Sequence, residues 1–581
     1  MTQIMNTPRL KPPRREDGRI IIHFDYDCFY AQVIENQQPA LKFLPLGIKQ
    51  KSILATCNYV ARRAGVNKLM GISDAKKVCP ELILVDGEDL SAFRDVSKKM
   101  YRLLRSFSWN RKLERLGLDE YFMDVTDMVD YNVELLNRNA LDQSFFCLSK
   151  DDPEQGFTYD ASSVAGCVYG STVSPGQDST SHTQYLRLVA ASHLARYTRM
   201  QIEEQGYTSA AGISTNKLLA KLVGNLHKPR NQTTLLAFTD EEVWSFMDTH
   251  QLRKIPGIGS RTTSILKSHL LPPPNLDSND EDSPKEALTA YLVRTHPAVS
   301  PSSLERLLFA PGAERGLGEK TWSLLHGVDN SAVKPASDVP TQISIEDTYQ
   351  GLDEPNEIST QLKLLSASLL RRMHIDLVEE GRWIAQPKTM RLTTRPYRRD
   401  KPYNWNRASR SVSLPGWACG LGIPNEDIAL RLAEEVLLPM FRRLNPGPRG
   451  WQVGLLNVCV TNMIIVAGIG EGAGAGAGGA GRDIGDMFRR QEDVLREFTA
   501  YEEEVDDEER VAEDDGRGFP DEVTDDNASG KISLDRKEEG EGSDVEWEED
   551  DHDGLETCTK CGHLIPSFAL TAHERYHAME P

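Results

Sequence analysis

The chain has 581 residues, of which 39% are hydrophobic and 27% charged, a composition typical of a globular protein with several domains rather than one core. No apolar run approaches the roughly 18 residues that span a bilayer, and the first residues predict no secretory signal, so we expect neither an integral membrane protein nor a secreted one. The net charge of −20 is concentrated in residues 471–557, which hold 32 acidic and 9 basic residues, whereas residues 1–470 have a net charge of +3; binding to nucleic acid is therefore not excluded.

The N-terminal part of the chain alternates between strand and helix patterns. Residues 1–18 are polar and contain prolines, and we expect them to be disordered. Residues 19–24 predict a strand, and a helix is expected to follow, ending near residue 36. Residues 113–125 predict two strands joined by a turn at 117–119.

The middle of the chain changes character twice. Residues 140–183 are rich in Ser, Asp, Gly and Thr without a sustained period, which predicts an insertion or a loop. A helix is expected from about residue 185 to 205. Residues 210–229 predict the end of a strand, a polar cap and an amphipathic helix that stops at Pro229. Residues 238–335 look helical, apart from a break at 271–285.

The last part of the chain begins with strands and helices at residues 341–466. A glycine-rich linker and an acidic stretch follow, and we expect both to be disordered. Within them, residues 483–501 predict a short helix. Its Ile484, Met487 and Phe488 weakly resemble a sliding-clamp-binding box without the leading glutamine, and a transient helix with no partner explains them equally well.

Three carboxylates stand at predicted strand ends. Asp25 lies at the end of an apolar strand, and Asp119 and Glu120 lie at a second strand junction nearly a hundred residues later. Hard oxygen ligands of this kind suit Mg²⁺, and two such ions can clamp both oxygens of a phosphoryl transfer. Spacing alone favours solvated turn residues, because that is the common fate of acidic residues beside strands.

Four segments favour a functional role for these carboxylates over the solvated-turn alternative. They are FDYDCFY (24–30), TCNYVARRAGV (56–66), ERLGLDEYFMDVT (114–126) and AGISTNKLLAKLVGNLHKP (211–229). In content and order they resemble the Y-family translesion DNA polymerases, and among these the iota type, over about residues 19–465. The resemblance implies an α+β multidomain right hand. Its expected parts are the palm (19–36 and 108–245), the fingers (37–107), a helix–hairpin–helix thumb (246–340), the little finger (341–468), a linker with an acidic disordered tail (469–556) and a small ββα-type zinc finger (557–581).

The resemblance also implies roles for single residues. Asp25, Asp119, Glu120 and the backbone carbonyl of Tyr26 would bind two Mg²⁺ ions, with Mn²⁺ as an alternative, and the three carboxylates would be catalytic. Tyr30 would be the steric gate against ribonucleotides, beside Phe29. The triphosphate would be held by Thr56, Tyr59, Arg62 and Lys228, with Lys221 a weaker candidate. The templating base would contact Gln50, Lys51, Ile53 and Ala55.

Two segments predict contacts with the DNA backbone. The segment KIPGIGSRTTSIL resembles a helix–hairpin–helix, in which Gly257 and Gly259 let main-chain N–H groups approach a phosphate. Residues 388–410 hold eight basic residues and one acidic residue. Alternation there would place Arg391 and Arg395 on one face of a strand, where they could follow a phosphate backbone.

The C-terminus carries a second metal-binding pattern. Cys558, Cys561, His573 and His577 have the spacing of one structural Zn²⁺ site. The segment resembles the ubiquitin-binding zinc finger of eta-type polymerases, although Arg575 stands where those fingers carry an acidic residue. The other seven cysteines have no regular spacing, which favours a reducing compartment.

These patterns together predict a nuclear DNA-directed DNA polymerase that performs low-fidelity translesion synthesis. Its expected partners are primer-template DNA and dNTPs, and ubiquitin or a ubiquitinated sliding clamp through the tail, with no membrane. The alternative is a non-catalytic scaffold that recruits repair factors through ubiquitin or the clamp. The presence of all three carboxylates argues against the scaffold, and a transcription factor with one finger would leave most of the chain unexplained.

Overall fold

The computed structural model describes residues 11–171, 180–270, 288–309, 315–397, 407–447, 450–466, 555–557 and 564–566. The chain forms two compact units, residues 1–336 with 542–581, and residues 337–541. The division after Ala336 lies close to the expected boundary between thumb and little finger.

A six-stranded sheet is the centre of the first unit. Its order is β5 (Leu113–Arg115), β6 (Glu120–Asp124), β1 (Ile21–Tyr26), β10 (Ser209–Ser214), β11 (Gln232–Leu236) and β9 (Cys167–Gly170). The neighbours β6 and β10 both run antiparallel to β1, whereas β10, β11 and β9 are parallel. Strands β1 and β10 are buried along almost their whole length, as expected for central strands covered on both faces.

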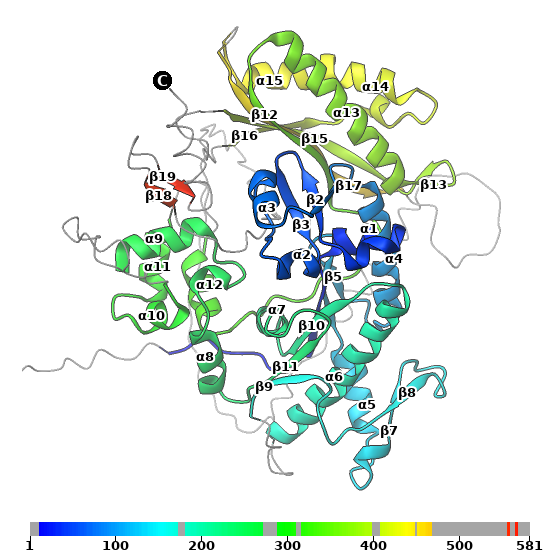
Figure 1. Cartoon of the computed structure of the whole chain (residues 1–581), viewed down its shortest axis with the longest axis vertical. Helices are drawn as coiled ribbons and strands as arrows, with labels where there is room; N and C mark the ends of the chain where they lie inside the picture. The colour runs from blue at the N-terminus through cyan, green and yellow to red at the C-terminus, as the bar shows by residue number, and fades with distance from the viewer. Residues whose placement is uncertain are drawn as a thin grey trace, which may run out of the picture. The chain divides into compact units, whose positions relative to one another are not determined.

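Alternation along β1 separates two faces of the sheet. Ile22 and Phe24 pack into the large core formed with α1 (Phe29–Gln37), α4 (Ser91–Ser106), α5 (Thr126–Glu134) and α6 (Thr180–Glu204). Ile21 packs on the other face with Ala220 of α7 (Lys217–Gly224), which lies over β10 in Figure 1. The close approach of α7 requires glycine at 212, because a Cβ there would lie 1.9 Å from the Ala220 carbonyl oxygen.

A smaller layer follows β1 and α1 in the chain. It holds the three-stranded sheet β3 (Ile53–Cys57), β2 (Leu46–Gln50), β4 (Ile83–Asp86), with η1 (Pro39–Phe43), α2 (Tyr59–Arg63) and α3 (Ile72–Val78). Its core includes Leu54, Cys57 and Ala61. The side chain of Asn58 caps α2 by accepting the Ala61 N–H, which fixes the start of that helix.

Short helices make up the rest of the first unit. They are α8 (Asp240–Asp248), η3 (Leu252–Lys254), α9 (Ser260–Leu270), α10 (Ala290–Thr295), α11 (Pro301–Leu308) and α12 (Leu317–Leu325). Thr239 and Glu242 form a capping box at the start of α8. These helices share a core with Leu218 and Leu222 of α7, so they are anchored on the helix that covers the sheet.

The second unit is a four-stranded antiparallel sheet covered by helices. The strand order is β12 (Gln342–Leu352), β17 (Val453–Ile465), β15 (Ala385–Pro396), β16 (Ala408–Ser413). The helical segments are α13 (Pro355–Leu377), η4 (Gly416–Cys419), α14 (Asn425–Arg431), η5 (Leu432–Leu437) and α15 (Leu438–Leu444), and a two-stranded ribbon joins β13 (Val378–Glu379) to β14 (Arg382–Trp383). Met390 and Leu392 point into the core with α13, so the next residues along β15 point away from it.

Of the two alternatives predicted for residues 140–183, an insertion or a loop, the described part of the range, 140–171 and 180–183, does not fit an irregular loop. After η2 (Leu141–Gln143), strands β7 (Ser144–Cys147) and β8 (Gly156–Tyr159) form a hairpin, and β9 joins the main sheet. The hairpin is held to α5 by two hydrogen bonds between Asn132 and the main chain of Cys147, of 2.7 and 3.1 Å. Strands of four residues are too short to show a period, which explains why the sequence did not predict these strands.

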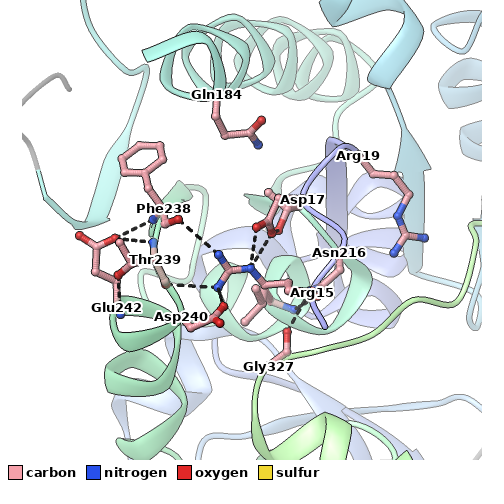
Figure 2. Close-up of polar contacts among 12 residues, drawn as sticks. Arg15, Asp17, Arg19, Gln184, Asn216, Phe238, Thr239, Asp240, Glu242 and Gly327 are labelled. Atoms are coloured by element: carbon pink, nitrogen blue, oxygen red, sulfur yellow. Dashed lines mark hydrogen bonds and ion pairs between the residues drawn. The ribbon is translucent and has the colours of Figure 1, made fainter. Parts of the chain in front are cut away.

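The N-terminal segment also differs from its prediction, because residues 11–18 have a defined path. Figure 2 shows Arg15 at the centre of a polar cluster. Its side chain is only 6% exposed and bonds Asp17 at 2.6 Å, Asp240 at 3.2 Å and the carbonyls of Thr239 and Phe238. Arg15 therefore ties the segment to the start of α8.

Replacement of Arg15 by alanine should lower the free energy of unfolding by about 2 kcal/mol, because the Asp17 and Asp240 carboxylates lose a partly buried cation. Chemical denaturation of both proteins measures the difference. The control is Arg14→Ala, since Arg14 is exposed. Equal midpoints for the two variants would contradict the prediction.

Several predictions lie outside the described residues. They are the disorder of residues 1–10, the linker and acidic tail, the helix at 483–501 and all four zinc-ligand candidates. Strands β18 (Leu555–Thr557) and β19 (Leu564–Pro566) form a short antiparallel hairpin on either side of residues 558–563. Among the described residues, no helix is long and apolar enough to cross a membrane.

Candidate active site

The three predicted carboxylates lie close together at neighbouring ends of β1 and β6, and Asp25 and Glu120 share the face of the sheet covered by α7. Asp25 on β1 pairs directly with Glu120 on β6, and the main-chain N–H of Tyr26 donates to the carbonyl of Asp119 at 3.0 Å. The antiparallel register thus brings together residues that are more than ninety positions apart in the sequence. Two negative side chains opposite each other repel unless cations lie nearby.

Glu120 has two such neighbours on its own face. His23 Nε2 lies 2.6 Å from Glu120 Oε1, and Lys221 Nζ of α7 lies 3.1 Å from the same oxygen. Burial alone would raise the pKa of Glu120, but His23 and Lys221 outweigh it and lower this pKa to about 2. Glu120 is therefore held as a carboxylate.

Asp119 has the opposite electrostatic environment. Burial, and then the negative charges of Asp25 and Glu120, raise its pKa to about 7. Lys228 Nζ makes a short ion pair with Asp25 Oδ2. Burial lowers the pKa of Lys228, but the charge of Asp25 outweighs it and the pKa is raised overall. Lys228 therefore stays a cation beside the carboxylates.

This donor set fits divalent cations by its chemistry. Asp25 and Glu120 share one face and Asp119 directly precedes Glu120. Burial and then these two like charges raise the pKa of Asp119, so added positive charge would relieve the repulsion. In the described ranges, no three metal-ligating side chains already converge on one point. Instead, Asp25 and Glu120 are turned toward Lys228 and Lys221, so a cation would compete with these ammonium groups.

Phe29 and Tyr30 begin α1, directly after β1. Both are nearly buried, at 2% and 8% exposure, and Tyr30 stacks on Phe93 of α4 with ring centroids 4.3 Å apart. Burial and then the charge of Asp119 raise the pKa of Tyr30 to about 12, so its hydroxyl stays protonated. The Tyr30 ring is therefore held in place by its stacking on Phe93, and it lies close enough to Asp119 to be affected by that charge.

Thr56, Tyr59 and Arg62 lie on β3 and α2. The Arg62 guanidinium stands 4.7 Å from the centroid of the Tyr59 ring, and its Nε donates to the carbonyl of Cys57 at 3.2 Å. Burial raises the pKa of Tyr59, and the charge of Asp27 adds to this effect. The planar Arg62 group is thus oriented by an aromatic ring and a carbonyl.

The four residues expected over a templating base surround the turn between β2 and β3. Gln50 pairs with Ile53 in register, and Lys51 occupies the turn with φ of 50°. Gln50 Nε2 donates to the Gly87 carbonyl at 2.9 Å, so its amide is already engaged. Ile53 is 39% exposed, whereas Ala55 packs against the large core.

Comparison with known proteins agrees with this arrangement. The sequence pattern of the impB/mucB/samB family matches residues 24–225, which hold all three carboxylates. Residues 24–225 are therefore similar to this family. The family resemblance inferred from the four motifs is confirmed.

Named relatives agree with this assignment. DNA polymerase iota of Homo sapiens is 34% identical over 454 residues, which cover 78% of this chain and 53% of that protein. DNA polymerase iota of Drosophila melanogaster is 31% identical over 405 residues, covering 68% and 46%. DNA polymerase eta of the same organism is 30% identical over 277 residues, covering 43% and 30%. The chain thus spans about half the length of the polymerase iota relatives.

The predicted DNA-contact residues lie outside the matched Y-family range. Gly257 has φ of +86°, a conformation that side chains rarely adopt, and the Gly259 carbonyl accepts the Thr263 N–H at 3.0 Å in the first turn of α9. In the second unit, Arg391 and Arg395 share the face of β15 opposite its core residues, as alternation predicts. Arg391 Nη2 donates to Gln342 Oε1 at 2.9 Å.

The sequence did not identify three residues that lie near the candidate carboxylates. His23 contacts Glu120, Phe93 supports Tyr30, and Asp27 accepts a hydrogen bond from the turn that carries Lys228. A signal for His23 existed, because strand alternation places it on the same face as Asp25. Phe93 carried none, since its contact joins two helices far apart in sequence.

Proposed function

We propose that this chain is a DNA-directed DNA polymerase that extends a primer 3′-hydroxyl opposite damaged template bases. The observation that carries the proposal is the pairing of Asp25 with Glu120, next to Asp119, on the face where Lys228 and Lys221 supply positive charge. The matched family and the relatives named as DNA polymerases support it. We assign two Mg²⁺ ions to the three carboxylates and the Tyr26 carbonyl, with Mn²⁺ as an alternative.

Bound ions of this kind would activate the 3′-hydroxyl and neutralise charge on the triphosphate. The chain's own residues would do the rest. Lys228 and Arg62 would attract and orient phosphate oxygens, and Thr56 and Tyr59 would donate hydroxyl hydrogen bonds. Gln50, Lys51, Ile53 and Ala55 would lie against the template base, and Gly257, Gly259, Arg391 and Arg395 would hold the duplex backbone.

Single-nucleotide insertion on primed DNA tests the proposal. Each dNTP is offered with Mg²⁺ opposite template A and opposite template T. Insertion opposite A supports the polymerase; G-favouring or poor insertion opposite T would assign a narrow, iota-type site, and equal accuracy opposite both a wider one. No insertion with either Mg²⁺ or Mn²⁺ would contradict the proposal.

Replacement of Tyr30 by alanine should raise the relative efficiency of ribonucleotide insertion by about a hundredfold or more. The ring, fixed by Phe93 at 4.3 Å, would no longer fill the space of a 2′-hydroxyl. The kcat/KM ratio for dCTP against CTP measures this. Tyr131→Ala, on the exposed Tyr131, is the matched control. An unchanged ratio would contradict the steric-gate role.

We assign the tail a second role. Cys558, Cys561, His573 and His577 would bind one structural Zn²⁺, because a segment this short cannot build a core without metal. The resulting finger would bind ubiquitin, alone or on a sliding clamp, and a nuclear location follows from action on genomic DNA. Titration of the full chain with ubiquitin, before and after zinc removal, tests this role.

A further inference from the structure

The turn at residues 227–231, which carries Lys228, is held by polar contacts along its length. His227 Nδ1 lies 2.9 Å from Thr233 Oγ1, and the main-chain N–H of Arg230 donates to Asp27 Oδ2 at 2.9 Å. The Arg230 side chain pairs with Glu203 at 2.8 Å in an exposed position. Arg230 has φ of 50°, a left-handed conformation that is uncommon and strained for a non-glycine residue.

Asp27 provides the buried part of this support. It directly follows β1, is 4% exposed, and accepts a second hydrogen bond from Thr208 Oγ1 at 2.8 Å on the same oxygen. Its other oxygen, Oδ1, has no hydrogen-bond partner within the described ranges. A buried carboxylate with one unpaired oxygen costs stability, so the stability of the fold alone does not account for an aspartate at this position.

The same cluster reaches the helix of the steric gate. Gln32 of α1 donates through Nε2 to the carbonyls of Asp27 and Thr208, the latter at 3.0 Å. Its Oε1 accepts the Thr208 N–H at 2.6 Å. Since α1 also carries Phe29 and Tyr30, Asp27 stands between the residues assigned to the sugar and the lysine assigned to the triphosphate.

We propose that Asp27 is a positioning residue that fixes Lys228 relative to Phe29 and Tyr30, and thereby sets the affinity for the triphosphate of the incoming nucleotide. The inference rests on the proposed polymerase function. Asp27 acts through the main-chain N–H of Arg230, two residues beyond Lys228. Without this bond the turn relaxes from its strained conformation and Lys228 samples positions outside reach of the phosphates.

The test compares dNTP kinetics of the full chain and its Asp27→Ala variant. We expect KM to rise about tenfold with kcat within about threefold, the size of effect of one lost charge-assisted hydrogen bond. Binding of a non-hydrolysable dNTP to the protein–primer-template complex should weaken by the same factor. Glu203→Gln, which weakens the exposed contact of the same arginine and a 3.7 Å ion pair with Arg199, should leave KM within about twofold.

A double-substitution cycle separates positioning from a general structural role. If Asp27 acts through Lys228, Asp27→Ala should not raise KM further in a Lys228→Ala background. Multiplicative effects, or an unchanged KM, would overturn the inference.

If Asp27→Ala does not fold, Asp27→Asn replaces it. The neutral oxygen of asparagine should give about a threefold rise in KM, and no rise in KM would overturn the inference. A native chain that inserts no nucleotide would overturn the proposed function as well, whereas failure of the Asp27 test alone leaves it intact.

Discussion

The combined substitution Asp119→Asn, Glu120→Gln should reduce kcat for nucleotide insertion by on the order of a thousandfold or more. Both changes keep the size of the side chains and remove negative charge from the face where Asp25 and Glu120 pair. Without that charge, the divalent cations proposed for this site would lose ligands, and phosphoryl transfer would lose its main electrostatic stabilisation. Single-turnover insertion with saturating dNTP and Mg²⁺ measures the loss.

The matched control is Asp142→Asn, which neutralises an exposed aspartate on η2. It should insert nucleotides at the native rate. If the double variant retained more than about a tenth of the native kcat, the two carboxylates would not be metal ligands. The scaffold alternative would then account better for the chain.

The single substitution Asp119→Asn should stabilise the metal-free protein at pH 8, even though it removes a group that we propose to be catalytic. The pKa of Asp119 is raised to about 7 in the folded chain, so the native carboxyl keeps a proton that the unfolded carboxyl has already released between about pH 4 and 7. Over this window, the free energy of unfolding falls as the pH rises, by up to about 4 kcal/mol in total. Asparagine does not titrate, so the variant does not lose this free energy of unfolding as the pH rises.

Thermal unfolding with a chelator at pH 5 and pH 8 checks this prediction. The Tm of Asp119→Asn should exceed the native Tm at pH 8, and the two should approach each other at pH 5. The lowered pKa of Glu120, about 2, has the opposite sign, and its contribution is lost only as the pH falls below about 4.5, which is below both pH values compared. Mg²⁺ should raise the native Tm at pH 8 more than that of the variant. A variant no more stable than the native chain at pH 8 would contradict the assignment.

The two predictions concern one electrostatic arrangement. Like charges that repel in the metal-free fold are the charges that would bind cations during catalysis, so stability and activity respond in opposite directions. Lys228 and Lys221 reduce the repulsion through their pairs with Asp25 and Glu120. These pairs also place the two lysines where the phosphates of a bound nucleotide could replace the carboxylates as their ion-pair partners.

The sequence alone determined the resemblance to the Y-family polymerases and the candidate residues for their chemistry. Local patterns were sufficient for this, because β1, the paired strands β5 and β6, and the capped helix α7 each form from a contiguous segment. Asn216, for example, caps α7 by accepting the Leu219 N–H three residues away, a contact that can be predicted from spacing. Alternation likewise placed Arg391 and Arg395 on one face of β15.

Only the tertiary structure decided which groups meet across the chain. The register of β1 against β6 sets Asp25 opposite Glu120 and brings His23 to the same carboxylate, and a shift by one residue would turn these side chains to the other face. The strand β9, the Arg15 cluster and the contact between Asp27 and Arg230 depend on residues roughly 60 to 220 positions apart. Such contacts leave no local period, because their energy comes from burial and charge pairing that exist only after the chain has folded.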